Sequence, residues 1–307
     1  MSTILIGVDE SARAEDAIAF GRHLAAVSNA YIVVACAFPY SDTPSRASNA
    51  AYREALADDA EATVREMRDR LDGIGADRLR IRITANPSPA HALHDLAEAE
   101  HAELIVVGSS HTGQLGRVLP GSTGERLLHG APCAVAIVPD AYRTRADHPI
   151  RRIGVAYDGS DEATDAVAAA VELARALGAE LEIAGVVAPI RYGAGGAMGA
   201  PIEVLPIADF ERDVQAGLDR AVAGVPEDVE ARSVCLAGDP ADALAEHSAT
   251  LDLLLAGSRG YGPLHSVLVG GVSGRLTRLA HCPVIIVPRG ARTPLATLFP
   301  AAVTITG

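Results

Sequence analysis

Short apolar runs alternate with longer amphipathic or alanine-rich stretches along the chain. In the first half, apolar runs predict strands near residues 4–8, 31–38, 79–84, 104–107 and 135–138. The stretches between them predict helices at about 12–27, 49–71, 89–101 and directly after Gly121. This alternation of strand and helix predicts a parallel sheet with right-handed crossovers and helices on both faces.

The second half repeats this plan at a fixed distance. Four pairs of residues are separated by the same 149 positions: Asp9 and Asp158, Gly108 and Gly257, Cys133 and Cys282, and Pro139 and Pro288. An equal offset at the beginning, middle and end of each half indicates duplication. We therefore predict an α/β protein with two tandem five-stranded, Rossmann-like domains at 1–142 and 150–289. A short linker joins them, and residues 290–307 form a C-terminal tail.

Composition excludes several classes of function. All 26 basic residues are arginine, because the sequence contains no lysine. A Walker A loop and a protein kinase each need a lysine on the phosphates, so both are excluded in their usual form, as is Schiff-base chemistry. The net charge of −13 argues against a nucleic-acid partner, since basic patches supply most binding to the phosphate backbone.

The cysteines and histidines indicate neither a disulfide framework nor a metal site. Cys36, Cys133, Cys235 and Cys282 have no CxxC spacing, so we expect four reduced thiols in the core. The ten histidines contain no HExxH motif and assemble no four-ligand set. The chain shows no run of 18 apolar residues and no signal peptide, so we expect a cytoplasmic protein without a membrane partner.

Two loops in each half reach the edge of the sheet where ligands bind. In an open parallel sheet this crevice lies beyond the carboxyl ends of the strands, where the strand order reverses. The first loop follows the first strand and carries Gly7 and Asp9, or Asp158 in the second half. The second loop follows the fourth strand and begins at Gly108 or Gly257.

The second loop carries the more specific pattern. From Gly257 it continues with two residues, Gly260, nine residues and Gly270, after which a helix begins. Backbone N–H groups in a glycine-rich loop and at a helix N-terminus favour a bound anion. In the first half, Ser122 and Glu125 have the spacing of a capping box, which supports a helix start there.

The chain combines this glycine spacing, an Asp after the first strand, and a last strand that ends in Val-Pro. Together these three features resemble the ATP-binding branch of the universal stress protein family. The resemblance covers residues 2–140 and 151–289 and is to the tandem form of the family. It implies an adenine nucleotide alpha-hydrolase-like fold, ATP bound between the two loops with or without Mg²⁺, and an intrachain pseudo-dimer. The family's contacts through the final strands also suit a homodimer.

The resemblance assigns roles to individual residues. Asp9 and Asp158 would meet the ribose and adenine side of the nucleotide, and their alternative role is a helix-start residue stabilised by the helix dipole. Main chain near Cys36 and Gly185 would frame the adenine. The other expected binding residues are Gly7, Gly108, Ser109, His111, Gly113, Gly121, Ser122 and Thr123 in the first half, and Gly257, Ser258, Arg259, Gly260, Gly270, Gly271 and Ser273 in the second.

Each half departs from the family pattern at a different position. In the first half, His111 stands where the family pattern has its second glycine. This residue is either a solvated loop histidine or a contact to phosphate. In the latter case, protonation around the ordinary pKa of about 6.5 would strengthen ATP binding below neutrality. In the second half, Gly271 stands where the family pattern has a Ser or Thr after its third glycine. The missing hydroxyl removes a hydrogen bond to phosphate worth about 0.5–1.5 kcal/mol, unless Ser273 supplies it. We therefore expect unequal affinities in the two halves.

The function expected from these observations is an ATP-binding stress-response or signalling protein. Bound nucleotide would change the shape or the partner surface of the two domains. No residue is placed to activate water on a γ-phosphate, so strong catalysis is not expected. Two alternatives stay open: an interaction module of the same fold that binds no nucleotide, and a nucleotide-transfer or slow ATP-hydrolysing enzyme.

Overall fold

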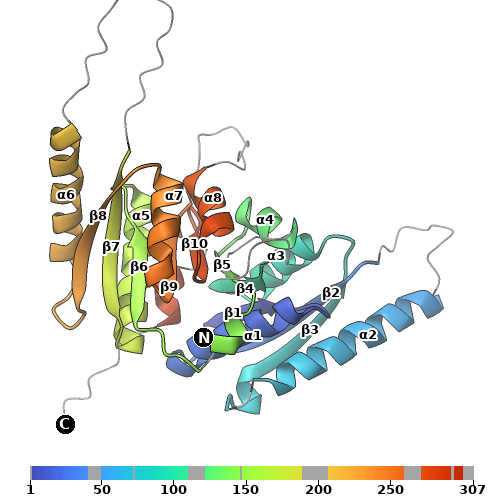
Figure 1. The fold of residues 1–307 in the computed structure, drawn as a ribbon. Helices are drawn as coiled ribbons and strands as arrows, with labels where there is room; N and C mark the ends of the chain where they lie inside the picture. Colours follow the sequence, from blue (N-terminus) through green and yellow to red (C-terminus); the bar gives the residue numbers. More distant parts are fainter. Residues whose placement is uncertain are drawn as a thin grey trace, which may run out of the picture.

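The computed structural model describes residues 2–40, 50–71, 73–109, 122–145, 147–188, 207–258, 271–291 and 294–299, without the side chains of 122 and 207–209. Within these ranges, ten strands form one sheet in the order β3-β2-β1-β4-β5-β10-β9-β6-β7-β8 (Figure 1). No helix in the described ranges is long and apolar enough to cross a membrane.

The predicted elements are confirmed, with ends that differ by a few residues. The first half contains β1 (Thr3–Gly7), α1 (Ala12–Val27), β2 (Tyr31–Phe38), α2 (Ala50–Asp69), β3 (Leu79–Ala85), α3 (Pro89–Ala99), β4 (Leu104–Gly108), α4 (Ser122–Leu128) and β5 (Ala134–Val138). The second half contains β6 (Arg152–Ala156), α5 (Asp161–Leu177), β7 (Glu180–Val187), α6 (Ile207–Ala223), β8 (Ala231–Ala237), α7 (Pro240–His247), β9 (Leu253–Gly257), α8 (Val272–Leu279) and β10 (Val284–Val287).

The two halves meet through their last strands. Strands within each half are parallel, whereas β5 and β10 pair antiparallel, with Ala136 opposite Ile285. The strand order therefore reads the same from both ends of the sheet, which relates the halves by an approximate twofold axis. One hydrophobic cluster packs α1, α2, α5 and α6 on one face, and a second packs α3, α4, α7 and α8 on the other.

The prediction of four core thiols is wrong for one cysteine. Cys36, Cys133 and Cys282 are buried, and burial raises the pKa of Cys36 to about 11 and that of Cys133 to about 12. Cys235 is exposed. It lies on β8, at the edge of the sheet, where burial alternates along the strand instead of covering both faces.

Each half ends in a short 3₁₀ turn that packs against its own first helix. In the linker, η2 (Tyr142–Arg145) lies on α1, where the Tyr142 ring meets Phe20 edge-on at 5.6 Å between centroids. The buried Asp16 carboxylate also accepts the N–H of Arg143 at 2.9 Å. In the C-terminal segment, η4 (Leu295–Leu298) packs on α5, and Phe299 is buried. Residues 294–299 thus contribute to the core of the second half.

Candidate functional site

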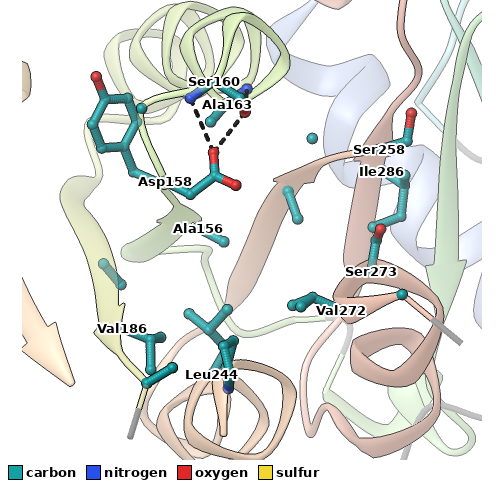
Figure 2. A pocket seen from close by; sticks show the side chains of 18 of the residues that line it. Ala156, Asp158, Ser160, Ala163, Val186, Leu244, Ser258, Val272, Ser273 and Ile286 are labelled. Atoms are coloured by element: carbon teal, nitrogen blue, oxygen red, sulfur yellow. Dashed lines mark hydrogen bonds between the residues drawn. The ribbon is translucent and has the colours of Figure 1, made fainter. Parts of the chain in front are cut away.

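A cavity of about 890 Å³ opens at the carboxyl edge of the sheet in the second half (Figure 2). Its floor includes Ala156 and Gly257, the last residues of β6 and β9, between which the strand order reverses. Ligand sites of α/β folds occur at this position, and their volumes are roughly 300–1,000 Å³. Place and size both suit a small organic ligand.

Asp158 forms one wall of the cavity and is fixed by the start of α5. Its Oδ1 accepts hydrogen bonds from the backbone N–H of Ser160 at 3.0 Å and from the Ser160 hydroxyl at 2.6 Å. The Ser160 Oγ in turn accepts the N–H of Ala163 at 3.3 Å and caps the helix. Figure 2 shows the other carboxylate oxygen of Asp158 directed toward the cavity. The two roles expected for this aspartate are therefore compatible.

Gly257 and Ser258 lie on the opposite side, at the end of β9. A Cβ on Gly257 would lie 2.7 Å from the carbonyl carbon of Glu162, so glycine allows the first turn of α5 to approach the strand. The Ser258 N–H donates to Val287 at 2.8 Å, and the Ser258 Oγ accepts the N–H of Arg289 at 3.1 Å. These bonds fix the main chain where the glycine-rich loop begins.

The N-terminus of α8 completes this side. Gly271 is the N-cap residue and supplies no side-chain cap, so the first N–H groups of the helix lack that partner. Such groups, together with the helix dipole, favour an anion. Ser273 also lines the cavity, and Figure 2 shows it on the same side as Ser258, across from Asp158.

Residues of β7, α6 and α7 form another part of the cavity, including the charged Asp213 and Arg220 of α6. Ala184 and Val186 of β7 contribute, as does Leu244 of α7. The predicted Gly185 has no side chain and is not itself among the lining residues, although Val214 and Leu218 of α6, which a Cβ there would face at 3.1 and 3.2 Å, are. The two neighbours of Gly185 contribute the side chains of β7 that line the cavity.

The first half places Asp9 at the corresponding edge in a different charge environment. Its Oδ1 accepts the N–H of Ser11 at 3.0 Å, and its Oδ2 lies 3.4 Å from the Arg13 guanidinium. A Cβ on Gly108 would lie 2.4 Å from the Arg13 carbonyl oxygen, so this glycine allows the same close approach as Gly257. The Ser109 hydroxyl is buried and has no hydrogen-bond partner within the described structure.

The other predicted residues are distributed as follows. Gly7 ends β1, where a Cβ would meet the flexible Leu93 side chain at 2.7 Å. Cys36 lies in β2 with a buried side chain, and Thr123 is half-buried in the first turn of α4. Outside the described residues are His111, Gly113 and Gly121 in the first half, the Ser122 side chain, and Arg259, Gly260 and Gly270 in the second.

Several lining residues, such as Val186 and Leu244, were not predicted from the sequence, and three of the missed residues come from the other half. Glu125 and Leu128 of α4, with His129 directly after this helix, contribute to the cavity of the second half. α4 begins at Ser122, as the capping-box spacing predicts, but the Glu125 carboxylate forms an ion pair with Arg278 of α8. Within the described ranges, no three His, Cys, Asp or Glu side chains gather as metal ligands.

The fold and the cavity define a tandem α/β protein with a ligand crevice at the point where strand order reverses. The chain belongs to the universal stress protein family, because a sequence model of that family matches residues 1–139 and 149–288. It is 29% identical over 301 residues to a universal stress protein of Mycolicibacterium smegmatis, covering 92% of this chain and 96% of the relative.

A solved structure of the family agrees in fold. The crystal structure of a universal stress protein from Archaeoglobus fulgidus DSM 4304 has a TM-score of 0.70 and is 20% identical, covering 94% of this chain and 98% of that one. Another match is a universal stress protein solved in complex with cAMP. It is 31% identical but covers only 45% of this chain and 97% of its own, with a TM-score of 0.31.

Proposed function

We propose that this universal stress protein binds an adenine nucleotide, with ATP as the physiological ligand, and acts as a nucleotide-dependent stress-response or signalling module. The observation that carries the proposal is the cavity between β6 and β9. It has Asp158 on one wall and the N-terminus of α8, without a side-chain cap, on the other. Bound nucleotide changes the surface that the two domains offer to a partner.

The lining residues suit the parts of a nucleotide. Apolar groups such as Val186 and Leu244 would cover the adenine, and the Asp158 Oδ2 would accept hydrogen bonds from ribose hydroxyls. The main chain at Ser258 and the first turn of α8, with Ser273, would hold the phosphates. A Mg²⁺ ion bound with ATP would be held chiefly by phosphate oxygens and water, as this ion commonly is.

Slow turnover is part of the proposal. The chain has no lysine to stabilise charge on a transferred phosphoryl group. The carboxylate nearest the proposed ribose, Asp158, is bound to the start of α5 and lies across the cavity from α8. We assign no residue to the activation of water. The bound nucleotide therefore acts as a regulatory ligand and is not a substrate for rapid hydrolysis.

Isothermal titration calorimetry of the purified chain with ATP, ADP, AMP and cAMP tests the proposal. We expect saturable binding of ATP and an increase in melting temperature on ATP addition, since a ligand that binds only the native state stabilises it. The absence of heat, thermal shift and co-purified nucleotide would favour the interaction module that binds no nucleotide. Steady ADP or pyrophosphate release over many turnovers would favour the enzyme.

A further inference from the structure

An ion pair joins the two halves beside the cavity. The Glu125 carboxylate of α4 pairs with the Arg278 guanidinium of α8. The two helices lie side by side near the junction of the halves (Figure 1). Under twofold symmetry, each contact between two halves has a twin in which the partners exchange positions. The 149-residue offset makes the twin of this pair Gly274 and His129.

The twin contact has a different character. Gly274 has no side chain, and a Cβ built there would meet no atom of the described residues within 4 Å. Both Gly274 and His129 line the cavity of the second half. The space that an acidic side chain would occupy in a symmetric interface is therefore part of the cavity, which extends to α4 of the first half.

This extension begins next to the proposed phosphate site. Gly274 directly follows Ser273 and lies in the first turn of α8, where N–H groups favour an anion. The His129 Nδ1 is hydrogen-bonded to the Glu125 carbonyl oxygen, which can only accept, so this nitrogen carries the hydrogen. The Nε2 is the ring nitrogen left for a ligand, and in the imidazolium form it donates to a phosphate oxygen.

The charges around the extension suit a phosphate. The acidic group in this wall, Glu125, is paired with Arg278, so its negative charge is compensated. Leu128 supplies an apolar side chain on the same wall. A nucleoside monophosphate held by the first turn of α8 would end there, whereas a longer phosphate chain would continue toward His129.

We propose that the cavity of the second half is a composite site in which His129 of the first half contacts the terminal phosphates of a nucleoside polyphosphate. The site then binds ATP more tightly than AMP. This inference rests on the proposed nucleotide-binding function and specifies which nucleotides the site prefers.

Calorimetry with ATP and AMP on three variants tests the inference. His129→Ala should weaken ATP binding about tenfold and change AMP binding less than twofold, because one charge-assisted hydrogen bond is lost. Gly274→Glu should fill the extension, pair with His129 and weaken ATP binding at least as much. Gly274→Ala is the matched control and should stay within threefold of wild type, since its methyl group leaves the extension open.

The outcomes separate this inference from the proposed function. The binding component weakened by Asp158→Asn belongs to the second half, and the ratio of ATP to AMP affinity is compared for that component. An unchanged ratio in both His129→Ala and Gly274→Glu, or an equal loss of ATP and AMP binding, overturns the composite site while nucleotide binding stands. A wild-type chain that binds neither nucleotide overturns the proposed function itself. Thermal melting confirms that each variant is folded.

Discussion

Replacement of Asp158 by asparagine tests the assignment of the cavity most directly. The Asn Oδ1 can still accept the N–H and the hydroxyl of Ser160, which the Asp158 Oδ1 accepts at 3.0 and 2.6 Å. The second oxygen, however, becomes an NH₂ group that cannot accept a ribose hydroxyl. Asp158→Asn therefore removes the proposed ligand contact and retains the bonds that fix the start of α5.

The expected loss follows from the strength of hydrogen bonds to charged groups, about 1.5–3 kcal/mol. Asp158 is exposed, so water competes for the carboxylate and the lower end of that range applies. This corresponds to about a tenfold weaker affinity, since about 1.4 kcal/mol is a factor of ten. The loss of affinity should be larger for AMP than for ATP. ATP carries more negative charge, so removing the charge of Asp158 also reduces its repulsion and offsets part of the loss.

Calorimetry with AMP and ATP measures this change, and Asp9→Asn is the matched control in the first half. We expect one binding component to weaken in Asp158→Asn and the same component to be retained in Asp9→Asn. Melting temperatures without ligand should agree between Asp158→Asn and wild type to within a few degrees. If neither component changes more than twofold, the nucleotide does not meet Asp158 and the proposed site is wrong.

Four further predictions concern the framework. Gly257→Ala should lower the free energy of unfolding by about 1–3 kcal/mol, because its Cβ would require a backbone shift in α5. Glu182→Val introduces the residue found at the equivalent Val33 and removes a buried carboxylate that pairs with Arg232 and His247. It should change the free energy of unfolding by less than about 1 kcal/mol or raise it, because a buried carboxylate is costly to desolvate and the exposed Arg232 keeps Glu180 as a partner at 3.0 Å. Phe299→Ala should cost about 3–5 kcal/mol by leaving a cavity, and denaturant titration measures all three. Cys235 alone should react with a thiol reagent before unfolding, and two fast thiols would contradict the assigned burial.

The predictable part of the fold lies in local patterns of the sequence. Helix α1 begins and ends where the apolar pattern placed it. Exposure of Cys235 could not be predicted in this way, because the edge position of its strand depends on the strand order. Burial of Phe299 depends on where a six-residue segment docks on α5, for which its short and irregular pattern gives no indication.

The candidate site was predictable only within each half. The glycine pattern and the aspartates identified Asp158, Gly257, Ser258 and Ser273, which the cavity brings together. His129 and its α4 neighbours were not predictable, because their place beside the cavity follows from the packing of one half on the other. A pattern that describes one domain contains no information about such a contact.

The charges beside the two aspartates are a second reason to expect unequal affinities in the two halves. Beside the first-half aspartate, the Arg13 guanidinium lies 3.4 Å from the Asp9 Oδ2 and would compete with a ribose hydroxyl for that oxygen. At the equivalent position the second half has Glu162, which pairs with Arg289 at 3.0 Å. The two halves therefore differ in charge at the first turn of the helix, independently of the altered glycine-rich loops. Duplication has preserved the sheet edge that could hold a nucleotide, whereas the charges around the two aspartates have diverged.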